Sequence, residues 1–244
     1  MPKKTLNKLR VLAVGANPDD IELLCAGTLA KYVQQGHEVF MRYATKGEKG
    51  HFHIPPDELA ATRKNEAEKA AAVIGLEVKG MGFPDLDIYY DRPTKAVFIE
   101  MIRETRPDLI ITHDPNDYLA DHRVTSQLVY DASFCAGLPH YKIPGGKHKA
   151  HTKLPPIFYM DTVAGADFFP TYYVDITDTF PLKKKMLGQH KSQLTWMKEH
   201  DGIDFLKFME DMARMRGEQC GVKYAEGFRR LGVWPRLTTE RLLP

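Results

Sequence analysis

The sequence has few cysteines, and no two of them have the short sequence separation that is typical of a metal-binding pair. Cys25, Cys135 and Cys220 are the three present, scattered along 244 residues. This odd and widely spaced set argues against a disulfide framework and against a cysteine metal site. Reduced thiols of this kind are typical of a cytoplasmic protein, which we therefore expect.

The sequence also lacks long apolar runs and a strong charge of one sign. No apolar segment approaches the length of a transmembrane helix, and the first residues lead into a strand without a signal-peptide apolar region. Lys and Arg total 34 against 32 Asp and Glu, which gives a net charge of +2. We therefore expect neither nucleic acid nor a membrane as a partner.

The chain does have a regular alternation of strand and helix patterns. Short apolar runs predict strands, and stretches with apolar residues at helical spacing follow them. The predicted strands are Val11–Ala16, Glu38–Thr45, Glu77–Phe83, Leu109–His113, Pro156–Met160 and Tyr172–Ile176, and the predicted helices are Asp20–Gln35, Asp57–Ile74, Thr94–Thr105, His122–Ala136 and two at about 178–191 and 203–217. This alternation predicts an α/β fold with a doubly wound, mostly parallel sheet and helices on both faces.

Residues 137–156 carry Gly, Pro, Lys and three histidines without any periodicity. A loop of this length is either functional or mobile, so it could be a substrate lid or a solvated basic loop. No linker precedes this segment. We therefore expect residues 1–244 to form a single domain.

Two polar clusters each follow a predicted strand. Asn17-Pro18-Asp19-Asp20 follows the first strand, and Asp121 and His122 follow the strand that ends at His113. Ligands of open α/β sheets bind at such strand ends, so Asp20 and His122 could share a cation, with Asp121 supporting the imidazole. The alternative is that both clusters only begin helices, with Asn17 and Asp121 as caps.

Together with other motifs in the same order, these clusters resemble the PIG-L/LmbE-like zinc-dependent N-deacetylases. The matching motifs are Asn17–Asp20 with Glu22, Cys25–Ala30, Thr45–Gly50, Arg63–Glu66 with Gly75, Asp117–His122, His190–Gln193 and Tyr224–Arg229. The resemblance implies a Rossmann-like fold and hydrolysis of N-acetyl groups on glucosamine-type sugars. It also implies a homo-oligomer, such as a trimer or a hexamer.

The resemblance assigns roles to individual residues. Asp19 matches the general base, while Asp20 and His122 match metal ligands. Asp121 matches the residue that supports the histidine chemistry. The implied reaction uses a metal to polarise a carbonyl and acidify water, while Asp19 removes the proton.

Three further residues are expected to bind substrate, namely Arg63, Asp85 and His190. Simpler interpretations stay open for two of them. Arg63 could form a solvated helical pair with Glu66. His190 could simply lie at the end of a basic helix, where the helix dipole stabilises a positive charge.

Two positions depart from the family pattern, which usually has histidine where this chain has Asn17 and Leu119. Asn17 can still ligate a metal through its carbonyl oxygen, and this harder, weaker donor makes manganese or another divalent ion competitive with zinc. Leu119 cannot donate a hydrogen bond, and the loss of one oxyanion donor typically costs about 10²–10³ in rate. His113 could take over the lost histidine function, or it could be an ordinary hydrogen-bonded strand histidine.

We therefore expect a metal-dependent amide hydrolase that removes an acyl group from an amino-sugar conjugate. One alternative keeps the divalent ion but acts on another carbohydrate derivative, for example by elimination. The other alternative is a catalytically inactive, sugar-binding homologue.

Overall fold

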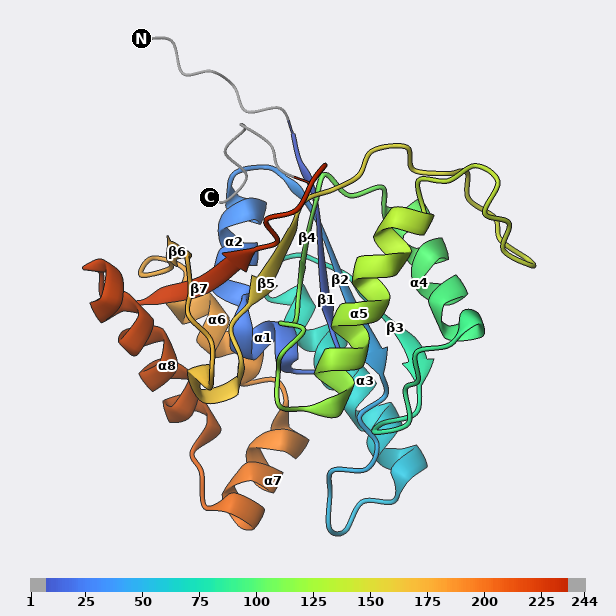
Figure 1. Cartoon of the computed structure of the whole chain (residues 1–244). Coiled ribbons are helices and arrows are strands. Elements are labelled where there is room, and N and C mark those ends of the chain that lie inside the picture. The colour runs from blue at the N-terminus through green and yellow to red at the C-terminus, as the bar shows by residue number, and fades with distance from the viewer. Residues whose placement is uncertain (1–7, 237–244) are drawn as a thin grey trace, which may run out of the picture.

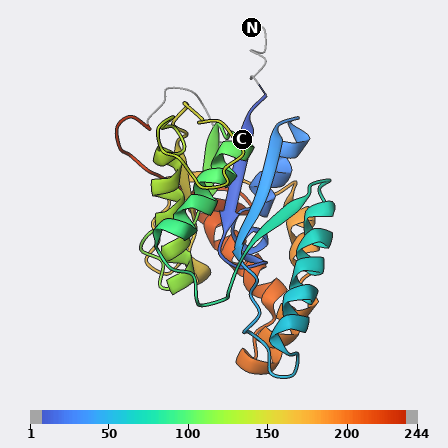
Figure 2. The same cartoon turned by 90° about the vertical axis from the view of Figure 1, so that its right-hand side faces the viewer.

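The computed structural model describes residues 8–236, in which helices cover both faces of one seven-stranded sheet (Figures 1 and 2). β1 (Arg10–Gly15) lies in its interior, where it pairs in parallel with β2 (Glu38–Thr45) and β4 (Leu109–Thr112). Val11 and Ala13 pack into one core and Leu12 and Val14 into the other, because successive side chains of a strand point to opposite faces. Burial on both faces explains why this strand is apolar without interruption.

The strand order is β3-β2-β1-β4-β5-β7-β6. The other strands are β3 (Val78–Phe83), β5 (Ile157–Met160), β6 (Tyr172–Asp175) and β7 (Ala225–Arg230). The first five strands in this order are parallel, whereas β7 runs antiparallel to both β5 and β6. The predicted doubly wound, mostly parallel sheet is confirmed, and its chain order reverses between β1 and β4. This switch point is where open α/β sheets bind ligands.

The helices divide between the two faces of the sheet. α4 (Arg92–Thr105) and α5 (Ala120–Cys135) cover one face. The other face is covered by α1 (Asp20–Leu24), α2 (Ala26–Gln34), α3 (Pro56–Ala72), α6 (Phe180–Leu187) and α8 (Phe205–Cys220). α7 (Lys191–Asp201) packs against α3 and α8. The predicted helix Asp20–Gln35 is interrupted at Cys25, whose backbone leaves the helical region. α7 and β7 were not among the predicted elements.

Hydrogen bonds hold the segment 137–156 against neighbouring parts of the fold. The backbone amides of Lys147 and His148 donate to the carboxylate of Glu100 on α4, and the His151 ring bonds the carbonyl of Pro107, just before β4. These contacts fix the segment near the amino end of β4, at the upper right of Figure 1. Within one chain this segment therefore lies at the opposite end of β4 from Thr112 and His113, and it does not cover them.

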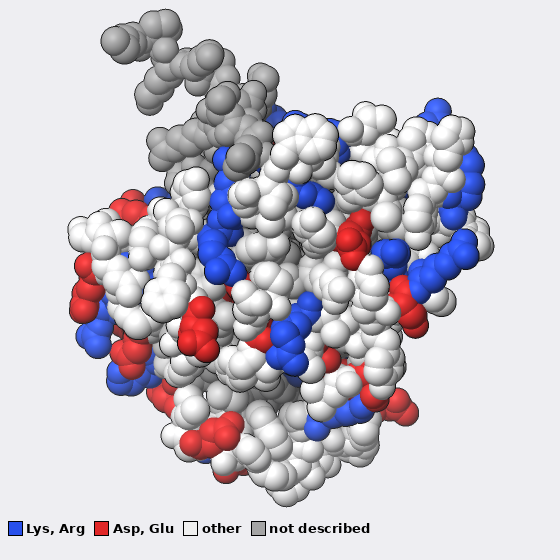
Figure 3. All heavy atoms as spheres, viewed as in Figure 1, with Lys and Arg blue, Asp and Glu red and all other residues white. Residues whose placement is uncertain are grey.

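The surface carries charges of both signs, as the nearly equal numbers of basic and acidic residues in the chain predict. On the face shown in Figure 3, basic and acidic side chains are interspersed among uncharged ones. Among residues 8–236, no helix combines the length and the apolar character needed to cross a bilayer.

Candidate active site

The pairing of β1 with β4 brings the two polar clusters together. Val14 of β1 pairs with Thr112 of β4, so the segments that leave these strands begin side by side. Asp20 begins α1, His113 directly follows β4, and His122 lies in the first turn of α5. All three side chains are buried, and one potential ligand atom from each lies within 4.8 Å of the others.

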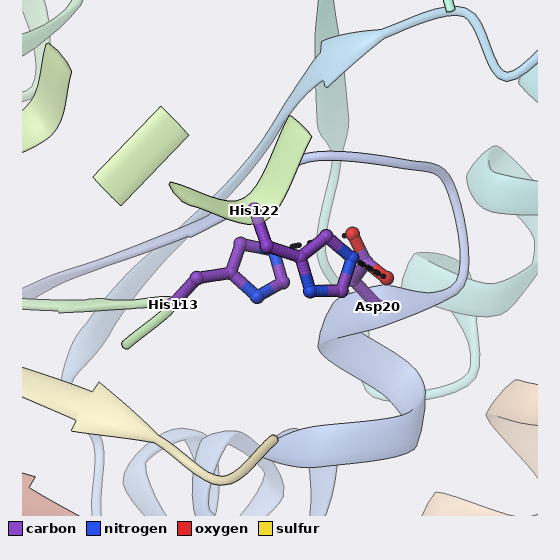
Figure 4. Close-up of side chains that lie close together, drawn as sticks. All are labelled: Asp20, His113 and His122. Carbon is purple, nitrogen blue, oxygen red and sulfur yellow. Dashed lines mark hydrogen bonds and ion pairs between the residues drawn. The ribbon is translucent and has the colours of Figure 1, made fainter. Parts of the chain in front are cut away.

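The two imidazoles face the same carboxylate, as Figure 4 shows. Nε2 of His122 lies 3.3 Å from Oδ1 of Asp20, and Nε2 of His113 lies 3.2 Å from Oδ2. The two rings stack with their centroids 3.7 Å apart. The Ala16 amide donates to Nε2 of His113 over 2.9 Å, so a metal ion bound by this nitrogen would replace that hydrogen bond.

The carboxylate that supports His122 is Asp117. Its Oδ2 lies 2.9 Å from Nδ1 of His122, and this contact fixes the orientation of the ring. The sequence interpretation gave this role to Asp121. Oδ2 of Asp121 instead accepts the Leu86 amide over 2.9 Å, so this buried carboxylate anchors the loop that follows β3.

The electrostatics of the cluster favour a cation. Burial opposes ionisation of Asp20, but the facing histidines outweigh it and hold the pKa of Asp20 well below its usual range. Burial also opposes a charge on His122, yet Asp20 and Asp117 raise its pKa to about 10. The pKa of His113 is lowered by burial and by the neighbouring His122. Two carboxylates thus stabilise one positive charge between them.

Asn17 lies beside the cluster, but its carboxamide oxygen accepts a hydrogen bond from the Thr45 hydroxyl. Its backbone amide donates to Oδ2 of Asp20 over 2.6 Å. The helix-cap alternative does not describe this arrangement, because the N-cap residues of α1 and α5 are Asp19 and Leu119, and neither makes a side-chain capping bond. Asn17 therefore positions Asp20 through the backbone.

Asp19 is buried next to the cluster in a strained conformation. Its φ of 116° lies in the left-handed region that few residues other than glycine adopt. Its Oδ1 lies 3.2 Å from Nη2 of Arg63. Burial, aided by the charge of Asp20, raises the pKa of Asp19 to about 7 against the opposing effect of Arg63. A carboxyl group with this pKa can exchange protons near neutral pH.

Arg63 is directed into the protein rather than into solvent. Its guanidinium donates to the carbonyls of Pro18 and Gly47 and pairs with Asp19. Gly47 has a φ of +66°, and a Cβ there would lie only 2.3 Å from Nη1 of Arg63, so glycine is required. The interpretation of Arg63 as a solvated helical residue is thus excluded, and its contacts are those of a residue that positions Asp19.

The other two expected substrate residues, Asp85 and His190, are both buried. His190 is fully buried, with Nε2 3.4 Å from Oε1 of Glu22. Asp85 accepts the Lys49 amide on Oδ2, while its buried Oδ1 has no hydrogen-bond partner among the described residues. Nδ1 of His190 likewise has no hydrogen-bond partner among these residues, so both side chains keep an unpaired polar atom inside the protein.

The Rossmann-like sheet and the buried acid–histidine cluster at its switch point define the protein as an α/β enzyme. The chain belongs to the PIG-L family (GlcNAc-PI de-N-acetylase), whose family model matches residues 12–133. Comparison with known structures agrees with the fold.

The relatives include deacetylases and a hydratase. The diacetylchitobiose deacetylase of Thermococcus kodakarensis is 26% identical over 230 residues, covering 90% of this chain and 82% of the relative. The N,N'-diacetylchitobiose deacetylase structure from Pyrococcus horikoshii superposes with a TM-score of 0.81 at 28% identity, covering 92% of this chain and 84% of that one. The 4-oxalmesaconate hydratase of Pseudomonas putida is 24% identical over 247 residues, covering 93% of this chain and 90% of the relative.

Proposed function

We propose that this protein is a metal-dependent hydrolase that removes an N-acetyl group from an amino-sugar conjugate. The observation that carries the proposal is the buried cluster of Asp20, His113 and His122 with Asp19 beside it at the switch point. Membership of the PIG-L family and the similarity to two diacetylchitobiose deacetylases support deacetylation as the reaction.

Asp20, His113 and His122 are the proposed metal ligands. One carboxylate and two imidazoles form a donor set that suits zinc, and three protein ligands leave a position open for water and substrate. His113 replaces Asn17 in this set because its imidazole lies within reach of Asp20 and His122, whereas the Asn17 oxygen is directed at the Thr45 hydroxyl. Zinc is accordingly the proposed metal, with manganese the second candidate.

Asp19 is the proposed general base. A divalent ion at the cluster would polarise the acetamide carbonyl and acidify the attacking water. In this proposal Asp19 takes a proton from that water and returns it to the departing amine. Arg63 holds the Asp19 carboxylate in place, and Asp85 is proposed to bind a substrate hydroxyl or amide through its unpaired oxygen.

Leu119 is expected to limit the rate on simple substrates. It lies at the start of α5, where relatives are expected to carry a histidine that donates to the developing oxyanion, and its side chain is 37% exposed. Restoring a donor with Leu119→His should raise the kcat for acetate release from N-acetylglucosamine by about tenfold or more. Leu119→Phe is the control that introduces a ring without a hydrogen-bond donor, and an unchanged kcat in Leu119→His would show that this position does not face the reacting carbonyl.

A second candidate function is hydration of a carbon–carbon double bond. This chain covers nearly the whole length of the 4-oxalmesaconate hydratase relative. A base beside a metal site can promote the addition of water to a double bond as well as hydrolysis. Incubation of the metal-loaded protein with N,N'-diacetylchitobiose and, separately, with 4-oxalmesaconate distinguishes the two. Acetate release from the sugar supports our proposal, whereas loss of 4-oxalmesaconate without acetate release would replace it with hydration.

On the resemblance alone, we further propose a cytoplasmic homo-oligomer, such as a trimer or a hexamer. Sedimentation equilibrium of the purified chain tests the assembly, and a monomer at micromolar concentration would overturn it.

A further inference from the structure

A partly exposed group of aromatic and imidazole rings lies at the same end of the sheet as the candidate site. We call it the aromatic rim and define it as His51, Phe52, Trp196 and His200. His51 and Phe52 lie in the loop between β2 and α3, and the other two residues lie on α7. Both segments project beyond the carboxyl ends of the parallel strands, at the bottom of Figure 1.

The rings of the aromatic rim pack against one another. The Phe52 and Trp196 centroids are 4.5 Å apart, and Trp196 stacks on His200 at 4.4 Å with an interplanar angle of 18°. His51 lies 6.4 Å from Trp196. Phe52 nevertheless remains 57% exposed, so a rigid aromatic surface is presented to solvent.

Hydrogen bonds connect the base of the Phe52 loop to the candidate site. The Gly47 carbonyl accepts from Arg63 over 2.8 Å, and the same guanidinium pairs with Asp19. The Lys49 amide donates to Asp85, and Gln193 of α7 donates to the Gly50 carbonyl over 3.4 Å. The loop is thus held in a fixed relation to the proposed base.

The tip of the loop is ordered by its own side chains. Nδ1 of His51 accepts the amides of both His53 and Ile54 at 3.1 Å. This turn holds Phe52 against Trp196 without burying it. The aromatic rim is therefore a preformed surface, and a ligand that binds there would not have to order a flexible loop.

We propose that the aromatic rim binds a second sugar ring, adjacent to the ring that carries the acetamide. This proposal rests on the proposed function and assigns the surface that holds the second ring of a substrate such as diacetylchitobiose. The C–H face of a pyranose packs on an aromatic ring, and imidazoles can bond the hydroxyls at its edge. Binding energy gained at this distance from the reacting amide would help to offset the donor that Leu119 lacks.

Tryptophan fluorescence tests this binding without any turnover. The chain has two tryptophans, so Trp234→Phe leaves Trp196 as the sole reporter. In this background we expect tri-N-acetylchitotriose to change the emission in a saturable manner, and Phe52→Ala to weaken the measured affinity about tenfold. Phe134→Ala is the matched control, because Phe134 is 54% exposed at the far end of α5 and should leave the affinity at the native value.

Acetate release provides the second readout. The ratio of kcat/KM for the trisaccharide to that for N-acetylglucosamine should fall about tenfold in Phe52→Ala and recover in Phe52→Tyr. Saturable binding without acetate release would overturn the proposed function but support the rim as a sugar site. No change in Trp196 emission, an equal loss on both substrates, or a change of oligomeric state in Phe52→Ala would overturn the rim proposal.

Discussion

Asp19→Asn is expected to lower the kcat for acetate release by about 10²–10⁴-fold while leaving the metal content nearly unchanged. Asparagine keeps the shape of the side chain but cannot accept the proton of the attacking water. The measurement pairs a deacetylation assay on N,N'-diacetylchitobiose with elemental analysis of the same preparation. The low kcat and the retained metal must be found together for Asp19 to be the base.

The control for Asp19→Asn must separate the loss of this particular carboxylate from the general effect of removing an ion-paired carboxylate. Asp211→Asn removes an exposed carboxylate that pairs with Lys207 on α8, and it should change neither kcat nor metal content. Thermal melting of both variants shows whether the fold is retained. Full activity in a folded Asp19→Asn protein would rule out the role of Asp19.

The second large effect is expected on the metal content of His113→Ala. Removing one of three protein ligands should lower the bound metal to about a tenth of the native content or less, and abolish turnover with it. Asn17→Ala should keep most of its metal, because the Asn17 oxygen bonds Thr45 rather than the cluster. Elemental analysis after gentle purification measures both variants.

A matched variant accounts for the cavity that His113→Ala creates. His151 is also buried, but its Nε2 bonds the Pro107 carbonyl near the amino end of β4, far along the strand from the cluster. His151→Ala should therefore lose stability without losing metal. Equal metal content in His113→Ala and His151→Ala would contradict the ligand assignment.

Most of the helices and strands could be predicted because each leaves its own pattern of apolar residues in a short stretch of the sequence. The uninterrupted apolar run of β1 and the helical spacing within α3 and α5 reflect burial on defined faces, and motif order indicated the family. α7 and β7 were missed for a physical reason. α7 buries only Ser192 and Gln193 among its residues, and β7 buries Glu226 against Lys183, so neither follows an apolar period.

The site could be predicted less fully, because the direction of a side chain depends on partners that are remote in the sequence. Asp20 and His122 are brought together as the strand ends indicated. His113 joins them only because β4 lies directly beside β1, and Asp117 rather than Asp121 reaches the His122 ring. Arg63 turns inward because the carbonyl of Gly47 and the carboxylate of Asp19 meet it there. No spacing rule encodes these contacts.

The central claim is that His113 replaces Asn17 as a metal ligand. Anomalous diffraction tests it most directly, with data from crystals of the native protein collected at the absorption edge of the metal that elemental analysis identifies. We expect one peak bonded to Asp20, His113 and His122, at about 2.0–2.2 Å from each donor atom if the metal is zinc. A peak bonded to Asn17, with His113 outside coordination distance, would contradict the claim.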